Sequence, residues 1–235
     1  MIKKLLAGAA LAAMTVAFVA APAAADVTVG SSDSGNCYPF VCNDSGVSVG
    51  QSIDFQEIYS STAFSGPLTF AAITFFTWST QPAVSVLAGN YNITFGTTLA
   101  PVGSGYPVGP LSNVVTFYNG ALGGPVGSTY AISGTPYTYN PADGNLVMEI
   151  VVTNQTALGN GSGNGYFLAD YTGAQVSRAY LETNVGTGGP TGALVTRFGA
   201  GVPEPATWAL MLAGFGATGA ALRRAHRKQA NVGVA

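Results

Sequence analysis

The stretch Asn90-Tyr91-Asn92-Ile93-Thr94-Phe95 alternates strictly between polar and apolar side chains. Successive side chains of an extended strand point to opposite faces, so the two aromatic rings and Ile93 share one face. Residues 146–153 repeat this pattern, with Leu146, Met148, Ile150 and Val152 on a single face. Two such stretches predict strands of a sheet that buries one of its faces.

More stretches of the same kind lie on either side, separated by turn residues. They are residues 48–59, 67–78, 113–118, 165–171, 176–182 and 193–198. Gly, Asn and Asp cluster between them, and no stretch shows sustained helical periodicity with caps. About eight to ten short strands predict an all-β fold, which we expect to be a jelly-roll-like β-sandwich over residues 26–201.

The charges exclude several classes of function. Only Arg178 and Arg197 of the eight Lys and Arg lie in residues 26–201, against nine of the ten acidic residues, a net charge of −7. Nucleic-acid binding needs clustered Lys and Arg, so we exclude it. The single histidine, His226, lies in the basic C-terminal tail, so the domain has no imidazole for a Ser-His-Asp or Cys-His nucleophile or for a metal site.

Residues 1–25 have the features of a signal peptide. Two lysines near the start form a positive region, and residues 5–21 are uncharged and apolar. Small residues then precede Asp26, so we expect cleavage between Ala25 and Asp26. The chain is therefore expected to leave the cytoplasm through the secretion translocon.

The C-terminal end combines a stiff Pro-Glu-Pro motif, an apolar stretch and a basic cluster. Residues 206–222 carry no charge, and a helix of that length reaches about 26 Å, at the short end of what crosses a bilayer core. The cations after it would stay in the cytoplasm. We therefore expect a transmembrane helix that holds the domain outside the inner membrane, followed by a short tail at residues 229–235.

This order of features resembles the PEP-CTERM sorting signal of the PEPxxWA type over residues 202–228. The matching residues are Pro203, Glu204, Pro205, Trp208 and Ala209 in the processing motif and Arg223, Arg224, Arg227 and Lys228 in the retention cluster. The resemblance implies processing by an exosortase, a membrane-embedded cysteine transpeptidase of Gram-negative bacteria. It also implies that the tail is removed and that the domain passes to the cell surface or extracellular matrix, commonly alongside exopolysaccharide. The alternative is a plain C-terminal membrane anchor without processing.

The only two cysteines are Cys37 and Cys42. In an exported chain this pair predicts a disulfide, and closing so small a loop stabilises the fold by roughly 2 kcal/mol.

Three turns gather the hard oxygen ligands that Ca²⁺ prefers. They are Asp33-Ser34-Gly35-Asn36, Asn43-Asp44-Ser45 and Asp143-Gly144-Asn145. None matches a full calcium-binding motif, and the same residues are common turn formers. We therefore expect no cofactor and no metal, with calcium binding as the alternative.

Paired carboxylates would be needed for glycoside hydrolysis, at a separation of about 5–9 Å. The candidates on expected strands are Asp54, Glu57, Glu149, Asp170 and Glu182. Glu149 shares a face with Val147 and Val151, so we expect it to point to solvent near a sheet edge. No spacing among the five is diagnostic, and we expect no catalytic residue and no enzymatic activity.

Aromatic side chains could bind sugars, or they could fill the core. The candidates are Tyr38, Tyr59, Trp78, Tyr106, Tyr118, Tyr137 and Tyr139. Tyr137 and Tyr139 share one face of an extended segment, which makes them the sugar-binding candidates. We expect a surface or matrix protein with a structural or adhesive role, associated with exopolysaccharide or biofilm. The alternatives are a carbohydrate-binding module of the same fold and a secreted glycoside hydrolase.

Overall fold

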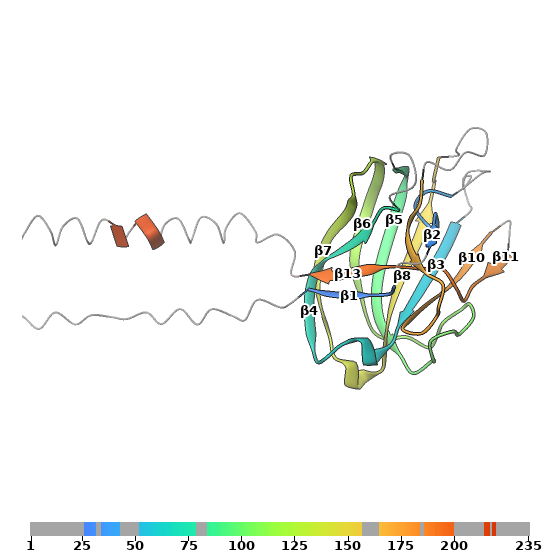
Figure 1. The fold of residues 1–235 in the computed structure, drawn as a ribbon, viewed down its shortest axis with the longest axis horizontal. Coiled ribbons are helices and arrows are strands. Elements are labelled where there is room, and N and C mark those ends of the chain that lie inside the picture. The colour runs from blue at the N-terminus through green and yellow to red at the C-terminus, as the bar shows by residue number, and fades with distance from the viewer. Residues whose placement is uncertain are drawn as a thin grey trace, which may run out of the picture.

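The computed structural model describes residues 26–31, 34–42, 52–78, 84–156, 165–183, 186–199, 214–216 and 218–219. The strands, in chain order, are β1 (Val27–Val29), β2 (Ser34–Asn36), β3 (Ser52–Tyr59), β4 (Leu68–Phe76), β5 (Ser85–Thr98), β6 (Ser112–Pro125), β7 (Thr129–Tyr139), β8 (Asn145–Thr153), β9 (Phe167–Asp170), β10 (Val176–Glu182), β11 (Gly186–Gly188), β12 (Ala193–Leu194) and β13 (Thr196–Gly199). Two short 3₁₀ turns are η1 (Ser61–Ala63) and η2 (Pro141–Asp143). The predicted all-β fold is confirmed (Figure 1).

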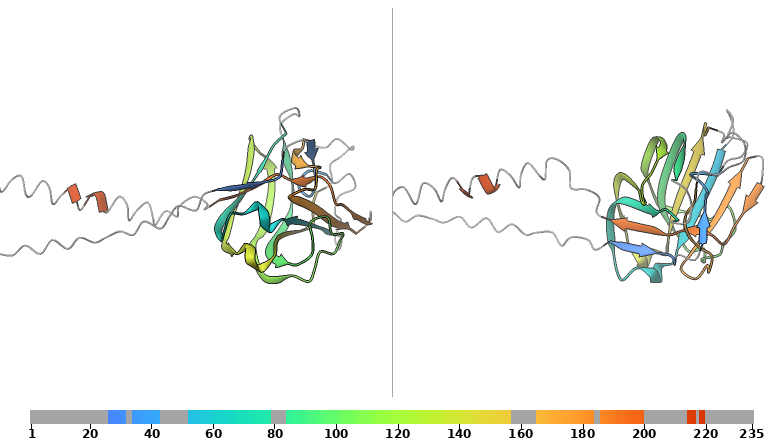
Figure 2. Two further views of the ribbon diagram at one scale, coloured as in Figure 1. Left: turned by 60° about the horizontal axis from the view of Figure 1, so that its bottom comes forward. Right: turned by 45° about the horizontal axis from the view of Figure 1, so that its top comes forward.

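The strands pair antiparallel in three sheets. A four-stranded sheet has the order β1-β13-β4-β7, a six-stranded sheet has the order β11-β10-β3-β8-β5-β6, and a small sheet has the order β12-β9-β2. Figures 1 and 2 show β1 and β13 running across the six-stranded sheet. Two sheets therefore face each other as in a sandwich, and the jelly-roll-like connectivity stays a prediction.

Aromatic rings fill the space between the two large sheets. Phe70 of β4 meets Phe95 of β5 with ring centroids 4.9 Å apart, and Phe198 of β13 lies 5.0 Å from Tyr59 of β3. All four side chains are fully buried. Tyr91 and Ile93 join the same core, so the face predicted from the alternating stretch is confirmed.

Strand β7 was not predicted, and a bulge interrupts its alternation. Ile132 and Tyr137 are both buried although an odd number of positions separates them. The pairing of β7 with β4 changes register between Phe70 and Ala72, which adds residues to β7 at that point. The bulge turns Tyr137 and Tyr139 back towards the core, and a search for strict alternation cannot follow such a change.

The outer face of the six-stranded sheet is partly covered by residues 99–111. Val108 of this segment packs in a small apolar cluster with Ile58, and its backbone N–H donates to Oε1 of Gln56 at 2.8 Å. Glu149 lies on this face in β8, which pairs on both sides with β3 and β5. The expectation that Glu149 lies near a sheet edge is therefore wrong.

The two ends of the chain lie largely outside this description. The predicted signal peptide, residues 1–25, and the tail, residues 229–235, are not among the described residues. Of the predicted transmembrane helix, residues 206–222, positions 214–216 and 218–219 are described and are helical. Within the described residues, no helix has the length and apolar character needed to cross a membrane.

Candidate functional site

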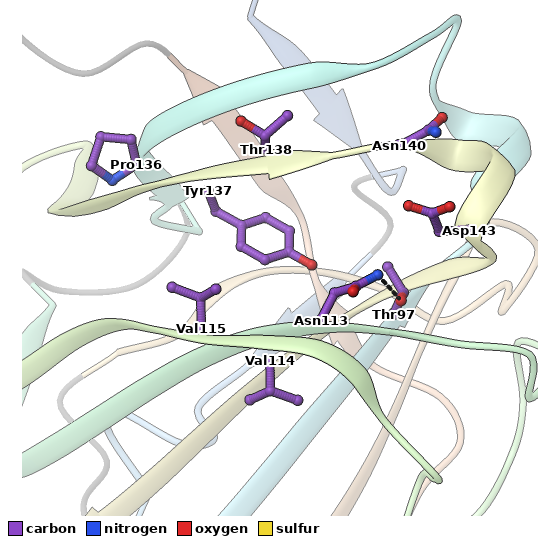
Figure 3. Close-up of a pocket in the computed structure, with 9 residues that line it drawn as sticks. All are labelled: Thr97, Asn113, Val114, Val115, Pro136, Tyr137, Thr138, Asn140 and Asp143. Carbon is purple, nitrogen blue, oxygen red and sulfur yellow. Dashed lines mark hydrogen bonds between the residues drawn. The ribbon is translucent and has the colours of Figure 1, made fainter.

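A pocket of about 420 Å³ opens between β6 and β7, which are edge strands of the two large sheets. Its lining residues are Thr97, Asn113, Val114, Val115, Pro136, Tyr137, Thr138, Asn140 and Asp143. Figure 3 shows the Tyr137 ring directed from β7 towards β6, with its hydroxyl group near Asn113. The volume falls within the range of about 300–1,000 Å³ that is typical of small-molecule sites.

The bulge in β7 places Tyr137 at the inner end of this pocket. Its ring centroid lies 5.7 Å from that of Phe70 and 5.6 Å from that of Phe95, so one side of the ring packs on the core. Gly134 lets β7 approach β6 closely, because a Cβ atom there would overlap the backbone carbonyl of Phe117. Beyond this contact between Gly134 and Phe117, β6 and β7 separate, and the pocket lies between them.

Short hydrogen-bonded turns position the polar groups around the ring. Asn113 adopts a φ of 54°, a left-handed conformation that Asn tolerates better than most residues, and its amide nitrogen donates to the Thr97 hydroxyl at 3.4 Å. Oδ1 of Asn140 accepts a hydrogen bond from the backbone N–H of Ala142 at 3.2 Å, which caps η2. Asp143 lies in the same turn, so this cap holds its carboxylate beside the pocket.

The pocket is acidic and holds a protonated hydroxyl group. Burial raises the pKa of Tyr137 above the ordinary tyrosine value, and the nearby charge of Asp143 raises it further. Asp143 is the single charged residue among those that line the pocket. Within residues 26–199, Arg178 and Arg197 are the only cations of the sequence, and Arg197 lies 3.8 Å from Asp26.

The two tyrosines predicted to bind sugars are separated by the structure. Tyr137 lines the pocket, with 3% of its surface exposed. Tyr139 is fully buried, packs against Phe64 with ring centroids 4.8 Å apart, and donates to the carbonyl of Gly144 at 2.7 Å. Their role in sugar binding stays a prediction.

Sequence reasoning missed the partners of Tyr137 in the pocket. Asp143 was noted only as a turn residue and a possible calcium ligand, although it follows Tyr139 by four positions. Asn113 was noted only as the start of a strand, and nothing local in the sequence indicates that β6 lies opposite β7. The pocket is formed by tertiary structure that no single stretch encodes.

Of the five candidate carboxylates, Asp54 and Glu149 share the outer face of the six-stranded sheet. Tyr106 donates its hydroxyl to Oδ2 of Asp54 at 2.8 Å. Burial raises the pKa of Asp54, and the charge of Glu149 contributes in the same direction. Glu149 accepts from the amide of Gln56 at 2.6 Å and from the hydroxyl of Thr94 at 3.2 Å. They lie on neighbouring strands, β3 and β8, so the hydrolase alternative would have to draw on these two.

Glu57 lies instead on the inner face of β3 and is fully buried. Its Oε2 accepts from the Tyr59 hydroxyl at 2.5 Å, and its Oε1 accepts from the backbone N–H of Leu194 at 2.5 Å. The Tyr59 hydroxyl also shares a hydrogen bond with Thr196 at 2.9 Å. Burial raises the pKa of Glu57 to about 8, so the carboxyl is mostly protonated at neutral pH.

The other two carboxylates have structural partners. Asp170 accepts from the backbone and hydroxyl of Thr172 and from the backbone of Ser31. Burial would raise the pKa of Asp170, but these hydrogen bonds outweigh it and lower the pKa. Glu182 accepts from the hydroxyl of Tyr38 at 2.8 Å. Neither Asp170 nor Glu182 lies beside Asp54 and Glu149 on the outer face of the sheet.

The remaining aromatic candidates also contact the protein. Tyr38 stacks on Tyr180 with centroids 5.1 Å apart, and Trp78 lies edge-to-face with Tyr166 at 5.9 Å. The Tyr118 hydroxyl donates to the carbonyl of Ala121 at 2.9 Å. These contacts account for the position of each ring.

The predicted disulfide between Cys37 and Cys42 is confirmed. It lies in the turn after β2, where the backbone N–H groups of Val41 and Cys42 both donate to the carbonyl of Cys37. The neighbouring Phe40 is fully buried and contacts Phe75 and Tyr91. The disulfide therefore stabilises a turn that inserts an aromatic ring into the core.

The calcium alternative concerns three turns. Asp33 and residues 43–45 lie outside the described residues. In the third turn, Oδ1 of Asn145 accepts from the backbone of Ser61, and the carbonyl of Gly144 accepts from Tyr139. Among the residues that the structure describes, no three His, Cys, Asp or Glu side chains gather as a metal site would require.

The residues predicted to direct export and sorting lie outside the described part of the chain, except Asp26. They are Ala25, Pro203, Glu204, Pro205, Trp208, Ala209, Arg223, Arg224, Arg227 and Lys228.

Comparison with known proteins identifies this C-terminal segment. A family model described as the PEP-CTERM protein-sorting motif matches residues 201–228. Neither a curated protein nor a solved structure matches the chain. The motif implies export, a transient membrane anchor and processing by an exosortase. The chain therefore carries a PEP-CTERM protein-sorting motif at residues 201–228, as the order of its Pro-Glu-Pro, apolar and basic segments predicts.

Proposed function

We propose that this protein is a non-catalytic component of the cell surface or extracellular matrix of a Gram-negative bacterium, with a structural or adhesive role beside exopolysaccharide or in a biofilm. The observation that carries the proposal is the match of residues 201–228 to the sorting motif. The acidic, lysine-free β-domain supports it, because such a surface suits a hydrated extracellular matrix rather than a nucleic-acid partner.

The two ends of the chain act in sequence under this proposal. The N-terminal signal starts export, and the basic cluster after residue 222 halts it, so the β-domain lies outside the inner membrane. An exosortase then cuts near the Pro-Glu-Pro motif and releases the domain from its apolar segment. The domain reaches its destination without the tail.

Mass spectrometry of the C-terminal peptide tests this route in cell-surface and culture fractions. We expect a C-terminus at or near residues 203–205, with residues 208–228 missing. Replacing Pro203, Glu204 and Pro205 with alanine should leave the tail intact, whereas deleting residues 229–235, outside the matched segment, should leave processing unchanged. An intact tail found only in the inner membrane would contradict the proposal and leave a plain membrane anchor.

Carbohydrate binding is the second candidate function. The pocket between β6 and β7 favours it, because Tyr137, Asn113 and Asp143 bring hydrogen-bonding groups to one cavity. Glycoside hydrolysis ranks below it, because Asp143 is the single carboxylate that lines this pocket and the reaction uses a pair. Turnover of native polysaccharide would separate hydrolysis from binding.

A further inference from the structure

We infer that the pocket between β6 and β7 binds an uncharged sugar residue and disfavours an acidic one. This inference rests on the carbohydrate-binding alternative given above and assigns to it both a site and a class of ligand. It follows from the shape of the pocket, from its hydrogen-bonding groups and from its charge.

The pocket offers an apolar wall and polar groups at its inner end. Val115 and Pro136 line one part, where they can contact the C–H groups of a sugar ring. The Tyr137 hydroxyl lies beside Asn113, between β7 and β6 (Figure 3). A ligand with several hydroxyl groups on an apolar ring matches this combination.

Each polar group has a defined capacity for hydrogen bonds. The Tyr137 hydroxyl is a donor at neutral pH, as an ordinary tyrosine is, and can donate to a sugar oxygen. A carboxylate accepts through two oxygens, so Asp143 can accept hydrogen bonds from two adjacent sugar hydroxyls. Asn113 can both donate and accept, and its single contact to Thr97 spans 3.4 Å.

The charge of the pocket decides between neutral and acidic sugars. Asp143 is the single charged residue among the lining residues, and no lysine occurs between residues 5 and 227. Arg178 donates instead to the backbone carbonyl of Thr191 and lies over the Tyr180 ring. A uronic acid would bring its carboxylate towards Asp143 with no cation to compensate, and like charges at close range repel.

The test is retention of the full chain, in detergent, on columns that carry immobilised glucose, galactose, mannose, N-acetylglucosamine or glucuronate. We expect retention on at least one neutral column and at least tenfold weaker binding to glucuronate. Tyr137→Phe removes the hydroxyl and keeps the packed ring, and Asn113→Gly removes the amide while tolerating the positive φ. Each should weaken neutral binding at least tenfold.

A matched control is Tyr118→Phe, which removes a tyrosine hydroxyl on β6 that bonds to Ala121 and does not line the pocket. It should bind like the wild type. Asp143→Asn should bring glucuronate binding closer to neutral binding. Melting curves of all variants identify any that fail to fold.

The possible results distinguish a failure of this inference from a failure of the carbohydrate-binding and sorting proposals. Neutral binding that survives both pocket variants, or glucuronate binding equal to neutral binding, overturns the inference and leaves the carbohydrate-binding alternative standing. No retention on any sugar overturns both. In either case the sorting proposal stands or falls separately, on the C-terminal peptide.

Discussion

Strand β3 carries an acidic side chain on each of its faces, and the two have opposite surroundings. Glu57 points into the core, is fully buried, and accepts hydrogen bonds from Tyr59 and from the backbone of Leu194. Asp54 points to the outer face, is partly exposed, and accepts from Tyr106 of the covering segment. Fixed donors satisfy both oxygens of the inner carboxyl, whereas on the outer one Tyr106 satisfies Oδ2 and leaves the buried Oδ1 without a hydrogen-bond partner among the residues that the structure describes.

Burial also affects the protonation of Glu57 and Asp54. Burial raises the pKa of both groups, and it raises that of Glu57 to about 8. A neutral carboxyl costs far less in an apolar interior than a charged one does. Glu57 is therefore a polar but uncharged part of the core at neutral pH, while hydrogen bonding from Tyr106 limits the shift at Asp54.

The largest expected effect comes from removing the inner carboxyl. Glu57→Ala would leave the backbone N–H of Leu194 without its acceptor and would open a cavity beside Tyr59. We expect the free energy of unfolding to fall by about 3 kcal/mol or more. Glu57→Gln, which keeps an acceptor and the volume, should lose much less. Denaturant unfolding of the full chain measures both, and equal losses would contradict the proposed role of the hydrogen bonds.

The pH dependence of stability is the next effect. Between the unfolded pKa of 4.5 and the folded pKa of about 8, folded Glu57 holds a proton that the unfolded chain has released. Its contribution is therefore complete below pH 4.5 and is lost as the pH rises to about 8, by up to about 1.4 kcal/mol per pH unit. Unfolding at pH 5 and pH 8 should show this fall in the wild type.

The variant Glu57→Gln is the control for that titration, because it cannot lose the proton and should reduce the dependence to the part that the raised pKa of Asp54 contributes. Asp170 does not interfere in this range. Its lowered pKa gives stability that is present above the ordinary value of 3.8 and is lost only at lower pH. A slope that persists unchanged in Glu57→Gln would assign the effect to another group.

Local alternation predicted much of this fold. The run through Tyr91, Ile93 and Phe95 has strict period two, and each of these side chains is buried as expected. The same rule failed at β7, where the bulge shifts the phase between Ile132 and Tyr137. Bulges depend on the partner strand, so a single stretch read alone does not reveal them.

The candidate site was predicted only in part, for a related reason. Tyr137 was chosen from its own segment, but Asn113 comes from an edge strand of the other large sheet, and no local pattern shows that these two strands face each other. The position of Glu149 failed in the same way, because alternation gives the face of a side chain and not the order of strands in the sheet. The sorting motif needed no fold, since its order along the chain is the signal.

The smallest expected effect uses one chemical change on both faces of β3. Tyr59→Phe removes a hydroxyl that donates to Glu57 and contacts Thr196 inside the core, so it should cost about 1–3 kcal/mol of unfolding free energy. Tyr106→Phe removes a hydroxyl that donates a single hydrogen bond, to Asp54, from a ring that is only half-buried, and should cost about 1 kcal/mol or less. Equal losses of unfolding free energy in the two variants would mean that residues 99–111 shield Asp54 from solvent as fully as the core shields Glu57. The contrast between the two acids would then depend only on their hydrogen-bond donors.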